Sequence, residues 1–159
     1  MSLAYHDRPY RKGVGVMLLS RSGLIFVGQR IDQVAEGWQM PQGGVDDGES
    51  AVQAALRECE EEIGTRNVAV LAESRHWRPY DLPEPIADKV WRGRYRGQKQ
   101  KWFALRFLGE DGEIRVAEVA EPEFRAWRWV DAAELMRLIV PFKRPVYREI
   151  LAEFDHLLD

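Results

Sequence analysis

Three glutamates in the stretch RECEEEIG, residues 57–64, are spaced so that they can share one face of a helix. At 3.6 residues per turn, Glu58, Glu61 and Glu62 fall within an arc of about 100°. Like charges one turn apart destabilise a helix by about 0.2–0.5 kcal/mol per pair. A hard divalent cation, which takes carboxylate, carbonyl and water oxygens as ligands, would relieve that repulsion. A solvated acidic helix face is the alternative, and the spacing alone leaves both interpretations open.

The residues around these glutamates are expected to hold the helix in place. Ser50–Ile63 has helical spacing, and Gly64 is suited to end the helix. Glu60 points away from the other glutamates and is expected to be solvated, whereas Arg57 can pair with a carboxylate one turn later. The stripe predicted to be buried consists of Val52, Ala55, Leu56, Cys59 and Ile63. Cys59 is therefore interpreted as a small core residue and not as a nucleophile.

Length and composition bound the class of protein. The chain of 159 residues, 45% hydrophobic and 31% charged, predicts a single globular domain over residues 1–159. No apolar run is long enough to span a bilayer. The start, MSLAYHDRPYRKG, lacks the apolar core of a signal peptide, so a cytoplasmic protein is expected. The only cysteine excludes an internal disulfide and cannot anchor a zinc site alone.

Charge is distributed unevenly along a chain whose net charge is −3. Residues 89–106 contain seven Lys or Arg and no Asp or Glu. Acidic residues gather in segments 46–49, 58–62 and 110–123. A carboxylate cluster that faces a basic wall would suit a phosphate-rich ligand held through a divalent metal. The alternative is that both kinds of segment are solvated loops and faces.

The order of the expected elements indicates the fold class. A hairpin is expected first, then a turn-rich loop over 40–48, the helix 50–63, three more strands and two closing helices. The expected strands are 13–19, 24–29, 68–77, 101–108 and 124–130, and the closing helices are 131–138 and 145–158. This mixed order predicts an α/β protein with helices packed on the faces of a mixed sheet.

Residues 43–65, GGVDDGESAVQAALRECEEEIGT, resemble the Nudix box, G-x5-E-x7-R-E-U-x-E-E-x-G-U, in which U is apolar. All seven fixed positions match: Gly43, Glu49, Arg57, Glu58, Glu61, Glu62 and Gly64. The departures are at U positions, which carry Cys59 and Thr65. The resemblance implies an α/β/α sandwich with a mixed sheet between helices.

The Nudix resemblance also implies a chemistry and a set of site residues. Nudix hydrolases cleave a nucleoside diphosphate linked to another group, with Mg²⁺ or Mn²⁺ as cofactor. The residues implied as metal ligands are Glu58, Glu61, Glu62 and the carbonyl of Gly43. Glu49 and Arg57 are expected to be structural. The glutamate that accepts the proton of the attacking water varies within the family, and Glu58 is the choice here.

Segments outside the box are similar to the bacterial RNA pyrophosphohydrolase and dinucleoside polyphosphate hydrolase branch of the family. The matching pieces include YRKGVGVML, GQKQKWF, PEFRAWRWV and FKRPVYR. This similarity implies that Glu123 is a further metal ligand. It places Arg11, Arg30, Lys99 and Lys101 near the polyphosphate, and Phe142 and Lys143 near the first base. Tyr80 and Trp38 are expected either in the pocket or in the core.

The expected activity is removal of pyrophosphate from a 5′-triphosphorylated RNA end, which leaves a monophosphate. Hydrolysis of diadenosine tetra- or pentaphosphate, with ATP as a product, is the alternative. The basic run 89–106 favours RNA, because a longer chain gains from phosphate contacts. A non-catalytic nucleotide-binding module would be expected to lack box carboxylates. A housecleaning enzyme for oxidised nucleotides or ADP-ribose does not account for GQKQKWF or FKRPVYR.

Overall fold

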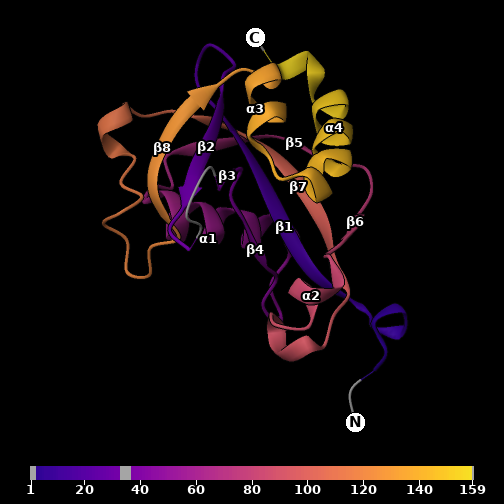
Figure 1. Ribbon diagram of the computed structural model, residues 1–159. Coiled ribbons are helices and arrows are strands. Elements are labelled where there is room, and N and C mark those ends of the chain that lie inside the picture. The colour runs from indigo at the N-terminus through magenta and orange to yellow at the C-terminus, as the bar shows by residue number, and fades with distance from the viewer. Residues whose placement is uncertain (1–2, 33–36, 159) are drawn as a thin grey trace.

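The computed structural model describes residues 3–32 and 37–158, in which eight strands form one mixed sheet (Figure 1). The strands are β1 (Tyr10–Leu19), β2 (Ile25–Arg30), β3 (Trp38–Gln39), β4 (Gln42–Gly44), β5 (Val68–Glu73), β6 (Arg78–Asp81), β7 (Gly97–Phe107) and β8 (Phe124–Val130). The helices are α1 (Ala51–Ile63), α2 (Glu84–Ala87), α3 (Ala132–Leu138) and α4 (Arg144–Glu153). None of the helices in these two ranges is both long and apolar enough to cross a membrane.

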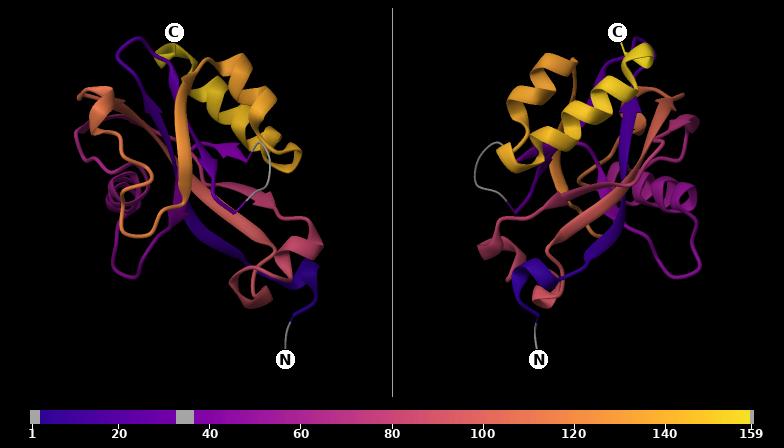
Figure 2. Two further views of the ribbon diagram at one scale, coloured as in Figure 1. Left: turned by 60° about the vertical axis from the view of Figure 1, so that its left-hand side comes forward. Right: turned by 90° about the vertical axis from the view of Figure 1, so that its right-hand side faces the viewer.

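Helices cover both faces of the sheet, as the predicted α/β/α sandwich requires (Figure 2). Because side chains alternate along a strand, β1 serves two cores at once. Val16 and Leu18 pack in the core that includes Cys59 and Ile63 of α1. Met17 and Leu19 face the opposite core, which contains residues of α3 and α4 such as Leu135, Tyr147 and Ile150. The predicted fold class is confirmed.

The sheet forks on one side of β1. β1 pairs with β7 in parallel along its whole length, from Tyr10↔Gly97 to Leu19↔Arg106. Its pairing with β2 is confined to Leu19↔Ile25, at the hairpin end. Beyond that point β4 takes the place beside β1 at Gly13–Gly15, while β2 pairs with β3 and β8. The fork brings the glycine-rich strand β4 next to α1.

The predicted helix is confirmed, together with the glycine that ends it, and the structure adds a capping box at its start. Ser50 Oγ accepts the Gln53 N–H at 3.2 Å, and Gln53 Oε1 accepts the Ser50 N–H at 2.9 Å. Gly64 ends α1 with φ 91°, a left-handed conformation that favours glycine. The buried stripe is confirmed for Ala55, Cys59 and Ile63, whereas the flanking apolar residues Val52 and Leu56 are half-buried.

Several predicted boundaries are wrong, for reasons that the pairing makes clear. Part of the loop predicted over 40–48 is strand β4, which a Gly-Gly pair disguises and which pairing with β1 stabilises. The strand predicted over 68–77 ends at Glu73, and β6 is a separate strand that contains Pro79. β7 starts at Gly97 and not at 101, because its Gln/Lys alternation gives no apolar signal. α4 spans Arg144–Glu153, shorter than the predicted 145–158.

Substitution of Gly15 by alanine tests the packing between β1 and β7. A Cβ at Gly15 would lie 2.3 Å from Cε2 of the fully buried Trp102 ring. We expect Gly15→Ala to cost about 1–3 kcal/mol and to lower Tm by roughly 3–10 °C. Gly112→Ala is the matched control, because a Cβ there meets nothing within 4 Å. Equal Tm values for both variants would contradict the packing of Trp102 against β1.

Candidate catalytic site

A cavity lies in the fork of the sheet, between β4, α1 and the start of β8; we call it the acidic cavity. Four glutamates and two arginines are among its lining residues. The lining is Arg11, Arg30, Gln39, Gln42, Gly43, Gly44, Glu58, Glu61, Glu62, Trp91, Gln98, Glu123 and Phe124. The structure therefore brings together all five predicted metal-ligand residues and two of the predicted polyphosphate contacts.

The three glutamates of α1 differ in their surroundings, although the helical spacing placed them on one arc. Glu58 and Glu62 are buried, with exposed fractions of 8% and 6%, whereas the Glu61 side chain is 57% exposed. The carboxylate of Glu58 occupies the space beside Gly43, where a Cβ would lie 2.0 Å from its Cδ. With any other residue at position 43, this carboxylate would have to move.

Arg57 ties the glycine-rich segment to the helix through one guanidinium. Its Nε donates to Glu49 Oε2 at 2.8 Å, and its Nη2 donates to the Gly44 carbonyl at 2.8 Å. Its Nη1 donates to Glu58 Oε1 at 2.8 Å and to Glu61 Oε2 at 3.1 Å. Arg57 thus links Glu49, Gly44 and two glutamates of α1.

Burial and mutual repulsion raise the pKa values of the inward glutamates. The pKa of Glu62 is raised well above its ordinary value, first by burial and then by the charges of Glu58 and Glu123. Burial also raises the pKa of Glu58, against the opposing hydrogen bond from Arg57. In addition, Glu62 Oε2 is buried without a hydrogen-bond partner. The cavity thus holds more negative charge than its own cations compensate.

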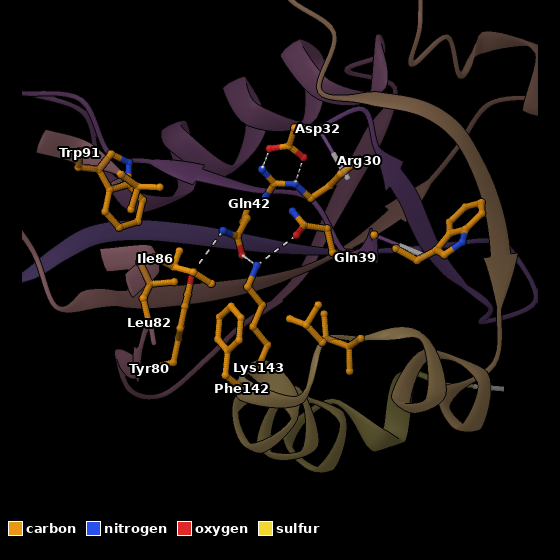
Figure 3. A pocket seen from close by; sticks show the side chains of 15 residues that line it. Arg30, Asp32, Gln39, Gln42, Tyr80, Leu82, Ile86, Trp91, Phe142 and Lys143 are labelled. Carbon is orange, nitrogen blue, oxygen red and sulfur yellow. Dashed lines mark hydrogen bonds and ion pairs between the residues drawn. The ribbon is translucent and has the colours of Figure 1, made fainter. Parts of the chain in front are cut away.

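A second cavity, the aromatic pocket, adjoins the acidic cavity and has a volume of about 330 Å³ (Figure 3). That size is within the range of small-ligand sites. Its lining includes Phe142 and Lys143, which were expected near the first base, and Trp38 and Tyr80, which were expected either in the pocket or in the core. Asp32 and apolar residues of α2 and the α3–α4 turn complete it. Arg30, Gln39, Gln42 and Trp91 line both cavities. The two spaces are therefore contiguous.

The model of the NUDIX domain matches residues 9–153 of this chain. The chain belongs to the NUDIX family. It is 57% identical over 145 residues to an RNA pyrophosphohydrolase of Rhodospirillum rubrum, an alignment that covers 91% of this chain and 87% of that protein.

Solved structures show the same fold at low sequence identity. The dihydroneopterin triphosphate pyrophosphohydrolase of E. coli has a TM-score of 0.69 at 21% identity, over 92% of this chain and 99% of that one. An Ap4A hydrolase of C. elegans has a TM-score of 0.60 at 16% identity, over 91% and 98% of the two chains. The Nudix fold expected from the sequence is confirmed.

Nudix hydrolases generally depend on a divalent metal, and the donors of the acidic cavity fit one. They are hard oxygens, and the unpartnered Glu62 Oε2 is one of them. As the side chains stand in the described residues, however, no three His, Cys, Asp or Glu groups converge on a single point. Two of these carboxylates, those of Glu58 and Glu61, are paired with Arg57. The ligand roles of Gly43, Glu58, Glu61, Glu62 and Glu123 stay predictions.

The lysines of the basic run do not face the acidic cavity of this Nudix domain. On β7, Gln98 and Gln100 point to the side of Tyr80 and Gln42, so Lys99 and Lys101 point to the other side. Lys101 Nζ lies 3.4 Å from Glu73 Oε2. Of the run 89–106, Trp91 and Gln98 reach the acidic cavity, and the expected basic wall is supplied by Arg11 and Arg30.

Sequence reasoning missed the glutamines that connect the two cavities. Gln42 Nε2 donates to Tyr80 Oη at 3.4 Å, and Gln100 Nε2 donates to Gln42 Oε1 at 3.2 Å. Gln98 and Gln100 are 1% and 0% exposed. The sequence signal that could have found them is the alternation of Gln and Lys in GQKQKWF. Glutamines two apart on a strand share one face, and a row of buried polar side chains indicates a site.

Trp91, also missed, sits on a strained backbone. Trp91 and Arg92 have φ values of 47° and 59°, and they are the non-glycine residues with positive φ in the part of the chain that the structure describes. For bulky side chains this conformation costs about 1–3 kcal/mol per residue and tends to occur at functional sites. It projects the indole to the junction of the two cavities.

Lys143 is the buried cation of the aromatic pocket. Its Nζ donates to Gln39 Oε1 at 3.1 Å and to Gln42 Oε1 at 3.3 Å, and it lies 5.7 Å from the centroid of Tyr80 (Figure 3). Burial lowers the pKa of Lys143 to about 7, and the charge of Arg30 acts in the same direction. The amine therefore changes charge near neutral pH.

This lowered pKa predicts a pH-dependent effect of Lys143→Met on stability. The folded-state pKa lies below the unfolded value of about 10.4. Between pH 7 and 10 the unfolded chain therefore binds more protons at this site, and wild-type stability rises with pH. The variant lacks this titrating amine. The Tm of the variant minus the Tm of the wild type should therefore increase as pH falls from 10 to 7, and it should be constant below pH 7.

The measurement is thermal unfolding of both proteins at pH 7 and pH 9.5. Loss of the amine also removes the Lys143 donor to Gln39 Oε1 and one of the two donors to Gln42 Oε1, which shifts the difference at both pH values alike. Lys89→Met, at an exposed lysine, controls for the removal of one positive charge. A Tm difference that is the same at both pH values would show that Lys143 is charged throughout.

Proposed function

We propose that this Nudix protein hydrolyses a phosphoanhydride at the 5′ end of RNA. A 5′-triphosphate end becomes a monophosphate, and pyrophosphate is released. The observation that carries the proposal is that the two cavities adjoin and share the lining residues Arg30, Gln39, Gln42 and Trp91. A 5′-polyphosphate can lie among the acidic residues while its nucleoside enters the aromatic pocket. The 57% identity to an enzyme named RNA pyrophosphohydrolase supports this substrate.

Mg²⁺ or Mn²⁺ is the proposed cofactor, held by Glu58, Glu61, Glu62 and Glu123 with the Gly43 carbonyl. When bound, the metal neutralises phosphate charge and activates water. Arg11 and Arg30 orient the polyphosphate; Arg30 is itself held by Asp32 through hydrogen bonds of 2.8 and 2.5 Å. Glu58 is assigned to accept the proton of the attacking water.

The aromatic pocket is proposed to take the nucleoside. Phe142 and Tyr80 lie with ring centroids 6.3 Å apart, and both line the pocket. Stacking on such rings tolerates any base, because every base has a π face. The Lys143 amine beside them supplies a hydrogen-bond donor to a base edge.

Hydrolysis of a dinucleoside polyphosphate with ATP as product is the second candidate, since it uses the same polyphosphate chemistry. A second nucleoside would have to lie beyond the acidic cavity. The adjoining cavity there is lined by Glu58, Glu60–Glu62, Gly64, Val119–Glu121 and Glu123, with no aromatic side chain. This surface suits metal-bound phosphates better than a base, which favours RNA. We further propose that residues 1–159 act as one catalytic domain in the cytoplasm, where transcripts are made.

The substrate assignment predicts a preference in kcat/KM. With Mg²⁺ at one salt concentration, we expect 5′-triphosphorylated RNA to exceed diadenosine tetraphosphate by tenfold or more. Product analysis should give pyrophosphate and a 5′-monophosphate end. A tenfold preference for the dinucleotide would replace RNA by the second candidate, and no turnover of either substrate would reject both.

A pair of neighbouring glutamates tests the ligand assignment. Glu61 and Glu60 have side chains that are each 57% exposed, yet only Glu61 lines the acidic cavity. We expect Glu61→Gln to lower kcat by about a hundredfold or more, the scale of losing one key electrostatic group. Glu60→Gln should stay within about threefold of wild type. Circular dichroism of both variants checks the fold, and a near-normal rate for Glu61→Gln would remove Glu61 from the mechanism.

A further inference from the structure

The segment between β6 and β7 carries an aromatic side chain to the boundary of the two cavities. Trp91 is half-buried and lines both of them. Of the four residues that do so, it is the one with an aromatic ring. In Figure 3 it lies at the far side of the pocket from Phe142 and Lys143. It therefore stands where a nucleoside would join its phosphates.

The backbone at this position is held in its left-handed conformation by local hydrogen bonds. The Gly93 N–H donates to the Val90 carbonyl at 2.9 Å, and the Arg94 N–H donates to the Trp91 carbonyl at 3.2 Å. At the ends of the segment, the Leu82 N–H donates to the Arg96 carbonyl at 2.9 Å. An extended backbone at residue 91 would direct the indole elsewhere, so this strained turn determines where the ring lies.

The ring contacts the one cation of the acidic cavity that lacks a carboxylate partner. The Cζ of Arg11 lies 5.0 Å from the Trp91 centroid, a cation–π distance. Arg30, the other arginine of the cavity, is paired with Asp32. Arg11, by contrast, makes no ion pair with any residue in ranges 3–32 and 37–158. Its guanidinium is available to an anion.

On the side away from Trp91, Arg11 packs against the glycine-rich segment of the Nudix box. A Cβ at Gly44 would lie 2.2 Å from Nη2 of Arg11, so the guanidinium packs against the backbone there. Its own strand fixes the base of the side chain, because Arg11 is paired with Gln98 in the β1–β7 register. The orientation of the guanidinium thus depends on Gly44 and on the face of Trp91.

We infer that Trp91 is a positioning residue for the polyphosphate, which it serves by holding the guanidinium of Arg11 at the mouth of the acidic cavity. This role rests on the proposed function, because the anion that Arg11 binds is taken to be a 5′-polyphosphate. A planar guanidinium binds phosphate oxygens through two parallel N–H donors, so its orientation matters as much as its charge. The indole supplies the flat, electron-rich face that keeps this orientation before substrate arrives.

The test compares aromatic and non-aromatic residues at position 91. We expect Trp91→Leu to raise KM for 5′-triphosphorylated RNA and the inhibition constant of pyrophosphate by about three- to tenfold, as for loss of one cation–π contact. The value of kcat should stay within about twofold, because Arg11 contributes to binding. Trp91→Phe keeps an aromatic face and should stay within about twofold of wild type in all three quantities.

A double-mutant cycle asks whether Trp91 acts through Arg11. In an Arg11→Gln background, Trp91→Leu should change the pyrophosphate inhibition constant by less than twofold. Arg92→Gly is the control for the segment, because glycine accepts its φ of 59° and Arg92 is exposed. This control should match wild type. Tm values report folding, and Trp91→Met provides a second non-aromatic variant if Trp91→Leu does not fold.

Three outcomes would overturn the inference: an unchanged pyrophosphate inhibition constant in Trp91→Leu, equal losses in Trp91→Phe and Trp91→Leu, or effects that multiply in the double mutant. Pyrophosphate inhibition can be measured with whichever substrate the wild type turns over. If RNA is not the substrate, the experiment is performed with diadenosine tetraphosphate. Failure of the proposed substrate and failure of the role of Trp91 are thus separate results.

Discussion

The parallel pairing of β1 with β7 is the constraint on which the rest of the structure depends. It pairs residues that are 87 positions apart in the chain, from Tyr10↔Gly97 to Leu19↔Arg106. The hydrophobic alternation along β1 then supplies one core under α1 and another under α3 and α4. Because β2 leaves β1 directly after the hairpin, the far half of β1 is open to β4. The acidic cavity is a consequence of this fork.

Within the fork, a small number of close contacts define the acidic cavity. Gly43 leaves the space that the Glu58 carboxylate fills, and Gly44 leaves the space against which Arg11 packs. Arg57 then connects Glu49, the Gly44 carbonyl and two glutamates of α1 with a single guanidinium. Five fixed residues of the Nudix box, Gly43, Glu49, Arg57, Glu58 and Glu61, are therefore one packing unit, in which glycine provides room and the arginine provides partial neutralisation.

The aromatic pocket shows how a hydrophobic cleft is given polarity without an uncompensated charge. Gln42, Gln98 and Gln100 form a chain of amide hydrogen bonds between Tyr80 and Lys143, and the Lys143 amine also donates to Gln39. Burial lowers the pKa of the lysine, so the site does not force a full charge into the interior. Amide groups can both donate and accept hydrogen bonds. They therefore connect the acidic cavity, lined by carboxylates, to the aromatic pocket without adding a charge to either.

The sequence by itself determined the helix α1, the glycine that ends it, the buried Cys59 and the identities of the box residues, because these depend on local spacing and capping chemistry. It also indicated the α/β class and placed Phe142, Lys143 and Glu123 at the site through family resemblance. Only the tertiary structure decided which glutamates are buried, that Lys99 and Lys101 face away from the cavity, and that Trp91 lies over Arg11. Those outcomes depend on strand register and on a left-handed turn, which bring together residues far apart in the chain, and no local pattern encodes such pairings.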